Sequence, residues 1–176
     1  MKIWKTLIAA SLIAAPGLAA ATTLTYDIMQ TDALTNTWRY DYTVANDSLG
    51  SPLSEFTIFF GLGTYSNLAV VASPLGWNSL VVQPDPLLPD NGFFDSLLVP
   101  GIAPGASLGG FSVSFVFHGA GTPGAQIFNI VDANFATIDR GDTHPNGSAT
   151  VPEPRSLALL GIGLFGLGVL RRRVSV

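Results

Sequence analysis

The sequence predicts an all-β protein with an antiparallel β-sandwich of Ig-like or jelly-roll type at its centre. An N-terminal signal peptide and a short C-terminal transmembrane helix are expected on either side. Three observations predict the sandwich: short segments of strict alternation, turn signals every 8–12 residues, and 31 Gly plus Pro among 176 residues. No twelve-residue window in the central region has a convincing helical period.

The N-terminal 21 residues have the three parts of a secretory signal. Lys2 and Lys5 form the positive region, and a short apolar run from Thr6 to Ala15 follows. Small residues after the Pro16 helix breaker offer Ala19 and Ala21 to signal peptidase. We therefore expect residues 1–21 to be removed and the mature chain to begin near Thr22. A retained anchor is the alternative, but the run is too short for one.

Residues 22–139 form the expected ectodomain, whose clearest strand is "TWRYDYTV" at 37–44. Trp38, Tyr40, Tyr42 and Val44 share one face, while the residues between them are polar. A period of two predicts a half-buried strand with its aromatic rings turned inward. Clean one-sided alternation of this kind favours antiparallel pairing.

Seven further segments have strand character, which brings the expected total to about eight. Phe111, Val113, Phe115 and Phe117 repeat the alternation, and Phe59 suggests that "EFTIFF" is covered on both faces. The other segments begin at Leu24, Leu68, Ser79, Phe93 and Gln126. Loops such as "NDSLGSP", "PDNG" and "GAGTPG" separate them.

Residues 140–150 are polar and rich in Gly, Pro, Ser and Thr, which predicts a flexible linker. Residues 151–176 then read "VPEPRSLALLGIGLFGLGVLRRRVSV". An apolar helix over 156–170 is expected, and its uncharged core of 14 residues would span about 21 Å, against about 30 Å of bilayer hydrocarbon. The basic tail of Arg171, Arg172 and Arg173 would stay cytoplasmic, which leaves the ectodomain outside the inner membrane.

This order of Pro-Glu-Pro, short apolar helix and arginine cluster resembles the PEP-CTERM sorting signal. Pro152, Glu153 and Pro154 match its core motif. The resemblance implies recognition by an exosortase, a membrane-embedded cysteine transpeptidase-like enzyme that removes the tail. It also implies passage to the cell surface or an extracellular matrix, after transient anchoring in the inner membrane, in Gram-negative bacteria that make exopolysaccharide. A plain C-terminal membrane anchor is the alternative reading.

Charge and residue types limit the function classes. Between Thr22 and Ser148, ten Asp and one Glu oppose two Arg, a net charge of −9 that argues against nucleic acid. The chain has no Cys, and its two histidines, His118 and His144, lack zinc-site spacing. No Gly-x-Ser-x-Gly elbow, phosphate-binding loop or dinucleotide fingerprint is present. We therefore expect no enzyme activity and no cofactor.

Two weaker binding hypotheses remain from the residue types. Trp77, which follows turn residues, and Tyr65 are candidates for stacking against sugar rings. Asp85, Asp90 and Asp95 in "QPDPLLPDNGFFDSL" are expected in a loop and could hold calcium, although they lack EF-hand order. The leading hypothesis is a non-enzymatic protein of the cell surface or exopolysaccharide matrix. The alternatives are a carbohydrate-binding surface module and, third, a secreted hydrolase.

Overall fold

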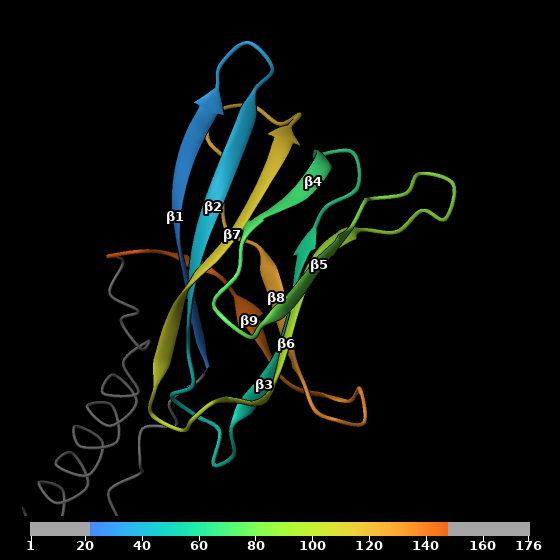
Figure 1. Ribbon diagram of the computed structural model, residues 1–176. Helices are drawn as coiled ribbons and strands as arrows, with labels where there is room; N and C mark the ends of the chain where they lie inside the picture. The colour runs from blue at the N-terminus through green and yellow to red at the C-terminus, as the bar shows by residue number, and fades with distance from the viewer. Residues whose placement is uncertain (1–21, 148–176) are drawn as a thin grey trace, which may run out of the picture.

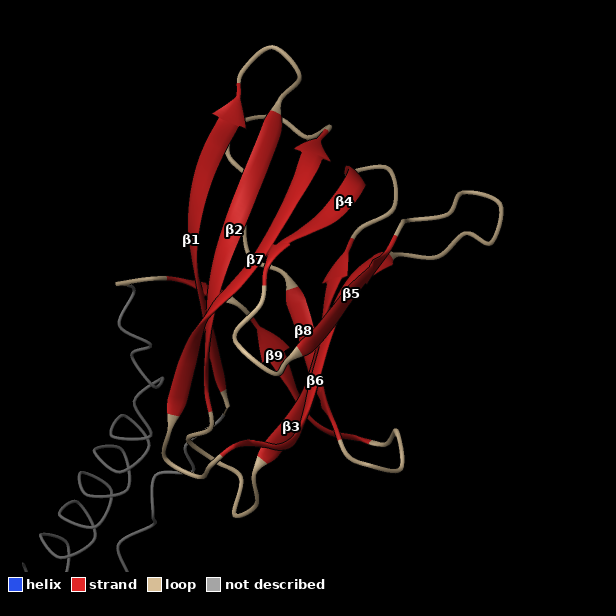
Figure 2. Ribbon diagram, viewed as in Figure 1, coloured by secondary structure: helices blue, strands red, loops and turns tan. Residues whose placement is uncertain are grey.

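The computed structural model describes residues 22–147, and these residues form ten β-strands with no helix (Figures 1 and 2). The prediction of an all-β, mainly antiparallel sandwich is confirmed. The expected signal peptide with Ala19 and Ala21, the Pro-Glu-Pro motif and the C-terminal helix with its basic tail lie outside the described residues. Along 22–147, no helix is long and apolar enough to cross a membrane.

The strands make two five-stranded sheets that face each other (Figure 1). The first sheet has the order β10-β1-β2-β7-β4 and the second the order β5-β6-β3-β8-β9. All neighbours are antiparallel except β1 and β10, which are parallel. The first sheet comprises β1 (Thr23–Asp32), β2 (Thr37–Ala45), β4 (Tyr65–Ala72), β7 (Ser107–Phe117) and β10 (His144–Pro145); the second comprises β3 (Leu53–Phe60), β5 (Asn78–Val82), β6 (Gly92–Ile102), β8 (Ile127–Val131) and β9 (Thr137–Asp142).

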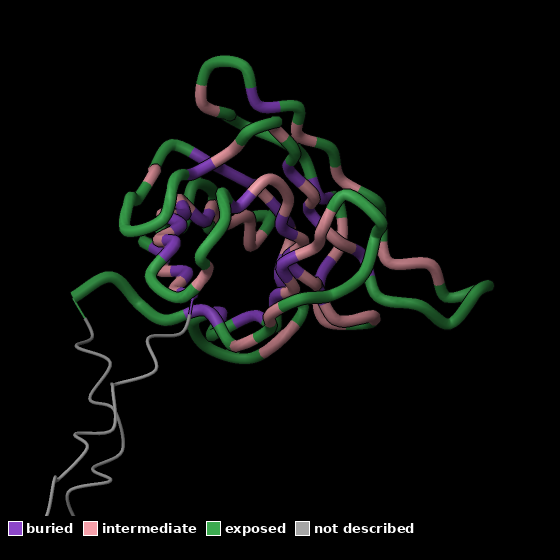
Figure 3. The backbone as a smooth tube through the Cα atoms, turned by 90° about the horizontal axis from the view of Figure 1, so that it is seen from below, coloured by how far each residue is buried: buried purple, intermediate pink, exposed green. Residues whose placement is uncertain are grey.

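One aromatic-rich core fills the space between the sheets. Tyr40 and Tyr42 of β2 are fully buried, as the alternation predicts, and face Phe56 and Phe60 of β3 from the other sheet. The rings pack edge-to-face or tilted, for example Phe56 against Phe111 at 4.9 Å between centroids. In the view from below, the buried positions lie along the strands that enclose this core (Figure 3). Burial of such large rings supplies the main stabilisation of a domain that has no disulfide.

Residues 140–145, which the sequence predicts as linker, belong to the sandwich instead. Arg140, Gly141 and Asp142 complete β9, and His144 and Pro145 form β10. Thr143 between them is fully buried although its neighbours are polar. The linker prediction rested on composition, which cannot detect backbone pairing: β9 pairs with β8, and β10 with β1. The described part of the chain ends at Gly147, and only four residues, 148–151, lie between it and Pro152.

Gly101 allows β6 to pass close to the start of β3. Its φ is +89°, a conformation that L side chains rarely adopt. A Cβ at this position would overlap the Leu53 carbonyl. The register between β3 and β6 shifts between Leu53 and Glu55, beside this glycine. Gly101 therefore fits a β-bulge that no other residue type could form without distortion.

Candidate functional site

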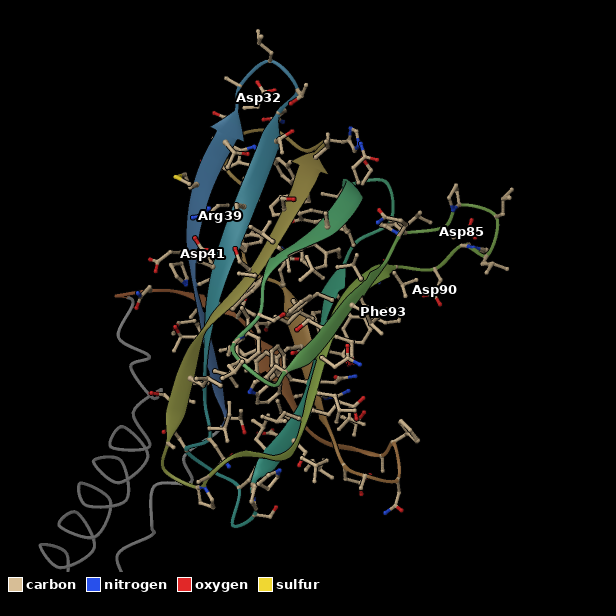
Figure 4. The ribbon with its side chains drawn as sticks, viewed as in Figure 1. Asp32, Arg39, Asp41, Asp85, Asp90 and Phe93 are labelled. Atoms are coloured by element: carbon tan, nitrogen blue, oxygen red, sulfur yellow. The ribbon has the colours of Figure 1, made fainter. Side chains whose placement is uncertain are left out.

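The outer face of the second sheet carries apolar side chains in addition to its buried inner face. Phe59 of β3 and Phe93 of β6 are cross-strand partners on this face, with ring centroids 6.5 Å apart. Val82 of β5 is opposite Phe93. In Figure 4 the Phe93 ring lies on the side of β6 away from the first sheet. Phe59 therefore points to the second face of its strand, but the predicted cover on that face is wrong, because no layer of residues 22–147 lies over it.

Aliphatic side chains extend this apolar area around the two rings. Leu80 is 45% exposed, Val82 is 43% exposed and Ile127 is 60% exposed. Leu97 on β6, opposite Asn78 of β5, is 38% exposed. We call the outward side chains of Phe59, Leu80, Val82, Phe93, Leu97 and Ile127 the outer apolar face. Exposed apolar area that gathers on one sheet face is typical of interaction surfaces.

Two carboxylates lie beside this outer apolar face. Asp95 of β6 is opposite Leu80 and Thr57, and the Thr57 hydroxyl donates a 2.8 Å hydrogen bond to its Oδ1. Burial raises the pKa of the Asp95 carboxyl, and the hydrogen bond from Thr57 opposes this shift. Burial and the nearby Asp95 charge raise the pKa of Glu55. Burial is the larger cause of both pKa shifts, since neighbouring side chains hold these carboxyl groups partly out of water.

Polar side chains of the neighbouring strands lie in the same cross-strand row as Asp95. Thr57 is opposite Asn129 of β8, and Asn129 is opposite Arg140 of β9. One row therefore presents a carboxylate, a hydroxyl, an amide and a guanidinium in order across the strands. With the neighbouring apolar row, these groups can bind a ligand that has both apolar faces and hydroxyl or amine groups.

The sugar-stacking hypothesis for Trp77 and Tyr65 is wrong, because both rings belong to the core. Trp77 is 7% exposed and packs edge-to-face on Phe111, with centroids 5.0 Å apart. Tyr65 is 8% exposed, and its hydroxyl accepts a 2.7 Å hydrogen bond from Gln126 Nε2. The turn residues before Trp77 predict exposure, but its ring packs against Phe56 and Phe111 of the core. The aromatic pair that does reach the surface is Phe59 and Phe93, and their alternation with buried residues is the signal that could have identified it.

The three aspartates of the calcium hypothesis do not come together. Asp85 and Asp90 exchange two backbone hydrogen bonds, of 3.1 and 3.2 Å, in the protruding loop between β5 and β6 (Figure 4). Asp85 Oδ1 accepts from the Leu87 N–H instead of facing a common centre. Asp95 lies further on, within β6. Residues 22–147 contain no group of three acidic or histidine side chains placed to hold a metal ion.

The histidines also have surface positions. His118 Nε2 lies 2.7 Å from the Ser66 hydroxyl; His118 is exposed just after β7, and Ser66 is half-buried near the start of β4. Along the described chain, no carboxylate forms a hydrogen bond with this pair. His144 lies on β10, distant in the fold from His118. A serine–histidine pair that lacks an orienting acid is a weak basis for nucleophilic catalysis.

The molecule thus has the features of a sandwich domain joined at its C-terminus to a sorting segment. The family model of the PEP-CTERM protein-sorting motif matches residues 150–173, so the chain carries this motif where the Pro-Glu-Pro order indicated it. The motif implies processing by an exosortase, and export to the cell surface or envelope. The match covers the C-terminal segment and does not include the sandwich.

Two solved structures are similar to the chain. One is a cohesin module from a family 33 glycoside hydrolase of Clostridium perfringens, with 5% identity, 72% of this chain covered, 97% of that chain covered and a TM-score of 0.40. The other is the chitin-binding domain of Chi18aC from Streptomyces coelicolor, with 22% identity and a TM-score of 0.37. The match covers 62% of this chain and 90% of that chain. Both TM-scores are below 0.5, so neither likeness enters the functional argument. No curated protein matches the chain.

Proposed function

We propose that this protein is a non-enzymatic component of the cell envelope or extracellular matrix, which acts by binding through its β-sandwich. The observation that carries the proposal is the sorting motif at 150–173 directly behind a folded sandwich. The signal-peptide features of residues 1–21 support export by the general secretory route. The net charge of −9 between Thr22 and Ser148 supports solubility outside the cell and disfavours nucleic acid as a partner.

Two enzymes and one membrane are the processing partners in this proposal. Signal peptidase cleaves after Ala21, and the apolar segment over 156–170 holds the chain transiently in the inner membrane. The exosortase then transfers the acyl group of one peptide bond to its cysteine sulfur. The tail leaves as an amine that takes up a proton, and water or an acceptor amine resolves the thioester.

Intact-mass measurement of the protein from envelope and extracellular fractions tests this route. We expect a chain that begins near Thr22 and lacks Arg171, Arg172 and Arg173. A variant with Pro152→Ala and Pro154→Ala should keep its tail and accumulate in the inner membrane. Wild-type protein that retains the three arginines in every fraction, or that is found in the cytosol, would contradict the proposal.

A carbohydrate-binding role is the second candidate, and the outer apolar face supports it. The CH-rich faces of sugar rings stack on aromatic side chains such as Phe93, while carboxylates and amides accept or donate hydrogen bonds to sugar hydroxyls. Asp95 and Asn129 supply such groups beside Phe59. The exopolysaccharide of the producing cell is the expected ligand class in this case.

Retention of the full mature protein on polysaccharide from the producing cell tests the second candidate. Phe93→Ala should abolish retention, because it removes one ring of the half-buried Phe59–Phe93 pair. Met29→Ala is the matched control, since Met29 is 47% exposed on the first sheet. Equal retention of both variants would exclude the outer apolar face as the sugar site. Turnover in a panel of glycosides and esters would instead favour the secreted-hydrolase alternative.

For the finer fold description we propose the Ig-like alternative. In Ig domains one sheet has the strand order A-B-E-D and the other C-F-G. The arrangement β1-β2-β7-β4 with β3-β8-β9 has the same order and the same antiparallel pairings. The hairpin of β5 and β6 is then an insertion at the β3 edge, and β10 an addition beside β1.

A further inference from the structure

The distance between the sandwich and the sorting motif is limited by chain length. Gly147 is the last described residue, and residues 148–151 alone separate it from Pro152. A fully extended chain covers about 3.5 Å per residue, so Pro152 lies at most roughly 18 Å from Gly147. A peptide bound in extended form over about six residues occupies about 20 Å of an enzyme groove. With β10 in place, the sandwich therefore lies within one such groove length of the motif that the enzyme must hold.

β10 is the strand most easily released from the sandwich. It has two residues, both exposed, at the edge of the first sheet, and its pairing with β1 is the one parallel pairing among the described strands. Asn146 also attaches this segment to β1. Its N–H donates a 2.7 Å hydrogen bond to the Tyr26 carbonyl, and its Nδ2 donates a 3.0 Å hydrogen bond to Asp27 Oδ2. No buried apolar side chain belongs to residues 144–147. Opening of this segment therefore breaks a few hydrogen bonds but exposes little apolar surface.

The release has a defined end at Thr143. This residue is fully buried. Its N–H donates a 2.8 Å hydrogen bond to the Gln126 carbonyl, and its hydroxyl accepts a 2.8 Å hydrogen bond from the Gln126 N–H. Detachment up to this point adds residues 144–147 to the free chain. The reach from Thr143 to Pro152 then becomes about 32 Å, compared with roughly 18 Å in the closed state.

We propose that β10 is a releasable latch, and that the exosortase processes the Pro-Glu-Pro motif from the state in which β10 has left β1. This inference rests on the proposed function, because it requires that the tail is processed. When opening and closing are fast, the rate of cleavage follows the population of the open state. Stabilising the β1–β10 pairing should therefore slow processing, and weakening it should accelerate processing.

A reversible disulfide gives the most direct test. Thr25 and His144 are register partners on β1 and β10, and partners on neighbouring strands lie within the Cα separation that a disulfide accepts. The natural chain has no Cys, so Thr25→Cys with His144→Cys would introduce the single disulfide of the exported protein. Pulse-chase in cells that carry an exosortase should show processing at least about tenfold slower, and a reductant should restore it. Ala69→Cys with Ser114→Cys, a register pair on β4 and β7 at the other edge of the same sheet, is the matched control and should be processed at the wild-type rate.

Two further variants test whether the length of free chain before Pro152 limits the rate of processing. Eight Gly and Ser residues inserted after Gly147 should restore processing of the disulfide variant, because the motif then reaches the enzyme without opening β10. Asn146→Ala should accelerate processing several-fold in the otherwise natural chain. The latch is refuted by wild-type processing of the oxidised disulfide variant, by failure of the insertion to restore it, or by an unchanged rate for Asn146→Ala. Absence of processing in the wild-type chain would instead count against the proposed function.

Discussion

Thr143 and Gln126 form two hydrogen bonds, both 2.8 Å long, where the chain passes from β9 to β10: the Thr143 N–H donates to the Gln126 carbonyl, and the Gln126 N–H donates to the Thr143 hydroxyl. Both residues are buried, at 0% and 5% exposure. Gln126 also donates from Nε2 to the Tyr65 hydroxyl and to the Gly124 carbonyl. This contact therefore ties the C-terminal strands to the loop before β8 and to β4 of the opposite sheet.

The first prediction concerns the Thr143 hydroxyl. Thr143→Val keeps the shape of the side chain but leaves the buried Gln126 N–H without an acceptor, which should lower the free energy of unfolding by about 1–3 kcal/mol. Thr143→Ser keeps the hydroxyl and should be affected less. Urea unfolding measures both values, and amide hydrogen exchange at Gln126 should accelerate in the valine variant. Equal stability of the wild type and Thr143→Val would show that this contact contributes nothing.

The second prediction compares two neighbouring core tyrosines. Within residues 22–147 the buried Tyr42 hydroxyl has no hydrogen-bond partner, whereas the Tyr40 hydroxyl donates 2.6 Å to the Gly124 carbonyl. Burial raises the pKa of both phenols, so both remain neutral at ordinary pH. Tyr42→Phe should therefore raise the stability by about 1 kcal/mol, and Tyr40→Phe should lower it by a similar amount. Thermal unfolding should show that the two substitutions shift the melting temperature in opposite directions. Destabilisation by Tyr42→Phe would mean that the Tyr42 hydroxyl has a hydrogen-bond partner.

The third prediction separates backbone strain from collision at two glycines. Gly101 and Gly105 both have positive φ, at +89° and +75°. A Cβ on Gly105 would meet open space, but a Cβ on Gly101 would overlap the Leu53 carbonyl. Gly105→Ala should cost about 1–2 kcal/mol from the left-handed conformation alone. Gly101→Ala should cost clearly more, because either the bulge or the β3 end must move; similar unfolding midpoints for the two variants would contradict this assignment.

The fourth prediction is a pH dependence that comes from Asp95. Its raised pKa means that the folded protein binds the proton more tightly than the unfolded chain, so ionisation of Asp95 lowers stability above the folded pKa. Asp95→Asn should be more stable than the wild type at neutral pH, and the difference should shrink as the pH falls toward the unfolded value of 3.8. Thr57→Val removes the hydrogen bond that opposes the shift and should strengthen the pH dependence. Chemical unfolding between pH 4 and 8 measures both, and a difference that does not vary with pH would reject the assignment.

The sequence by itself determined the strands with strict alternation and the sorting segment. In β2 and in the Phe111–Phe117 part of β7, large apolar residues recur at every second position, so local periodicity identifies both the strand and its inward face. The Pro-Glu-Pro order with its flanks is also a linear signal, because a processing enzyme reads an extended chain. The family match at 150–173 agrees with that reading.

Three features followed only from the tertiary structure: the burial of Trp77, the strand pairing of β9 and β10, and the position of the outer apolar face. Trp77 is buried because Phe56 and Phe111 from two different sheets close around it, a contact that no local pattern encodes. β9 and β10 are polar segments that form strands because their backbones bond to β8 and β1. The sequence does not reveal the register of β9 on β8, and β1 is distant in sequence from β10. Backbone pairing stabilises such segments without an apolar face, and for this reason residue composition indicated a linker where the fold has strands.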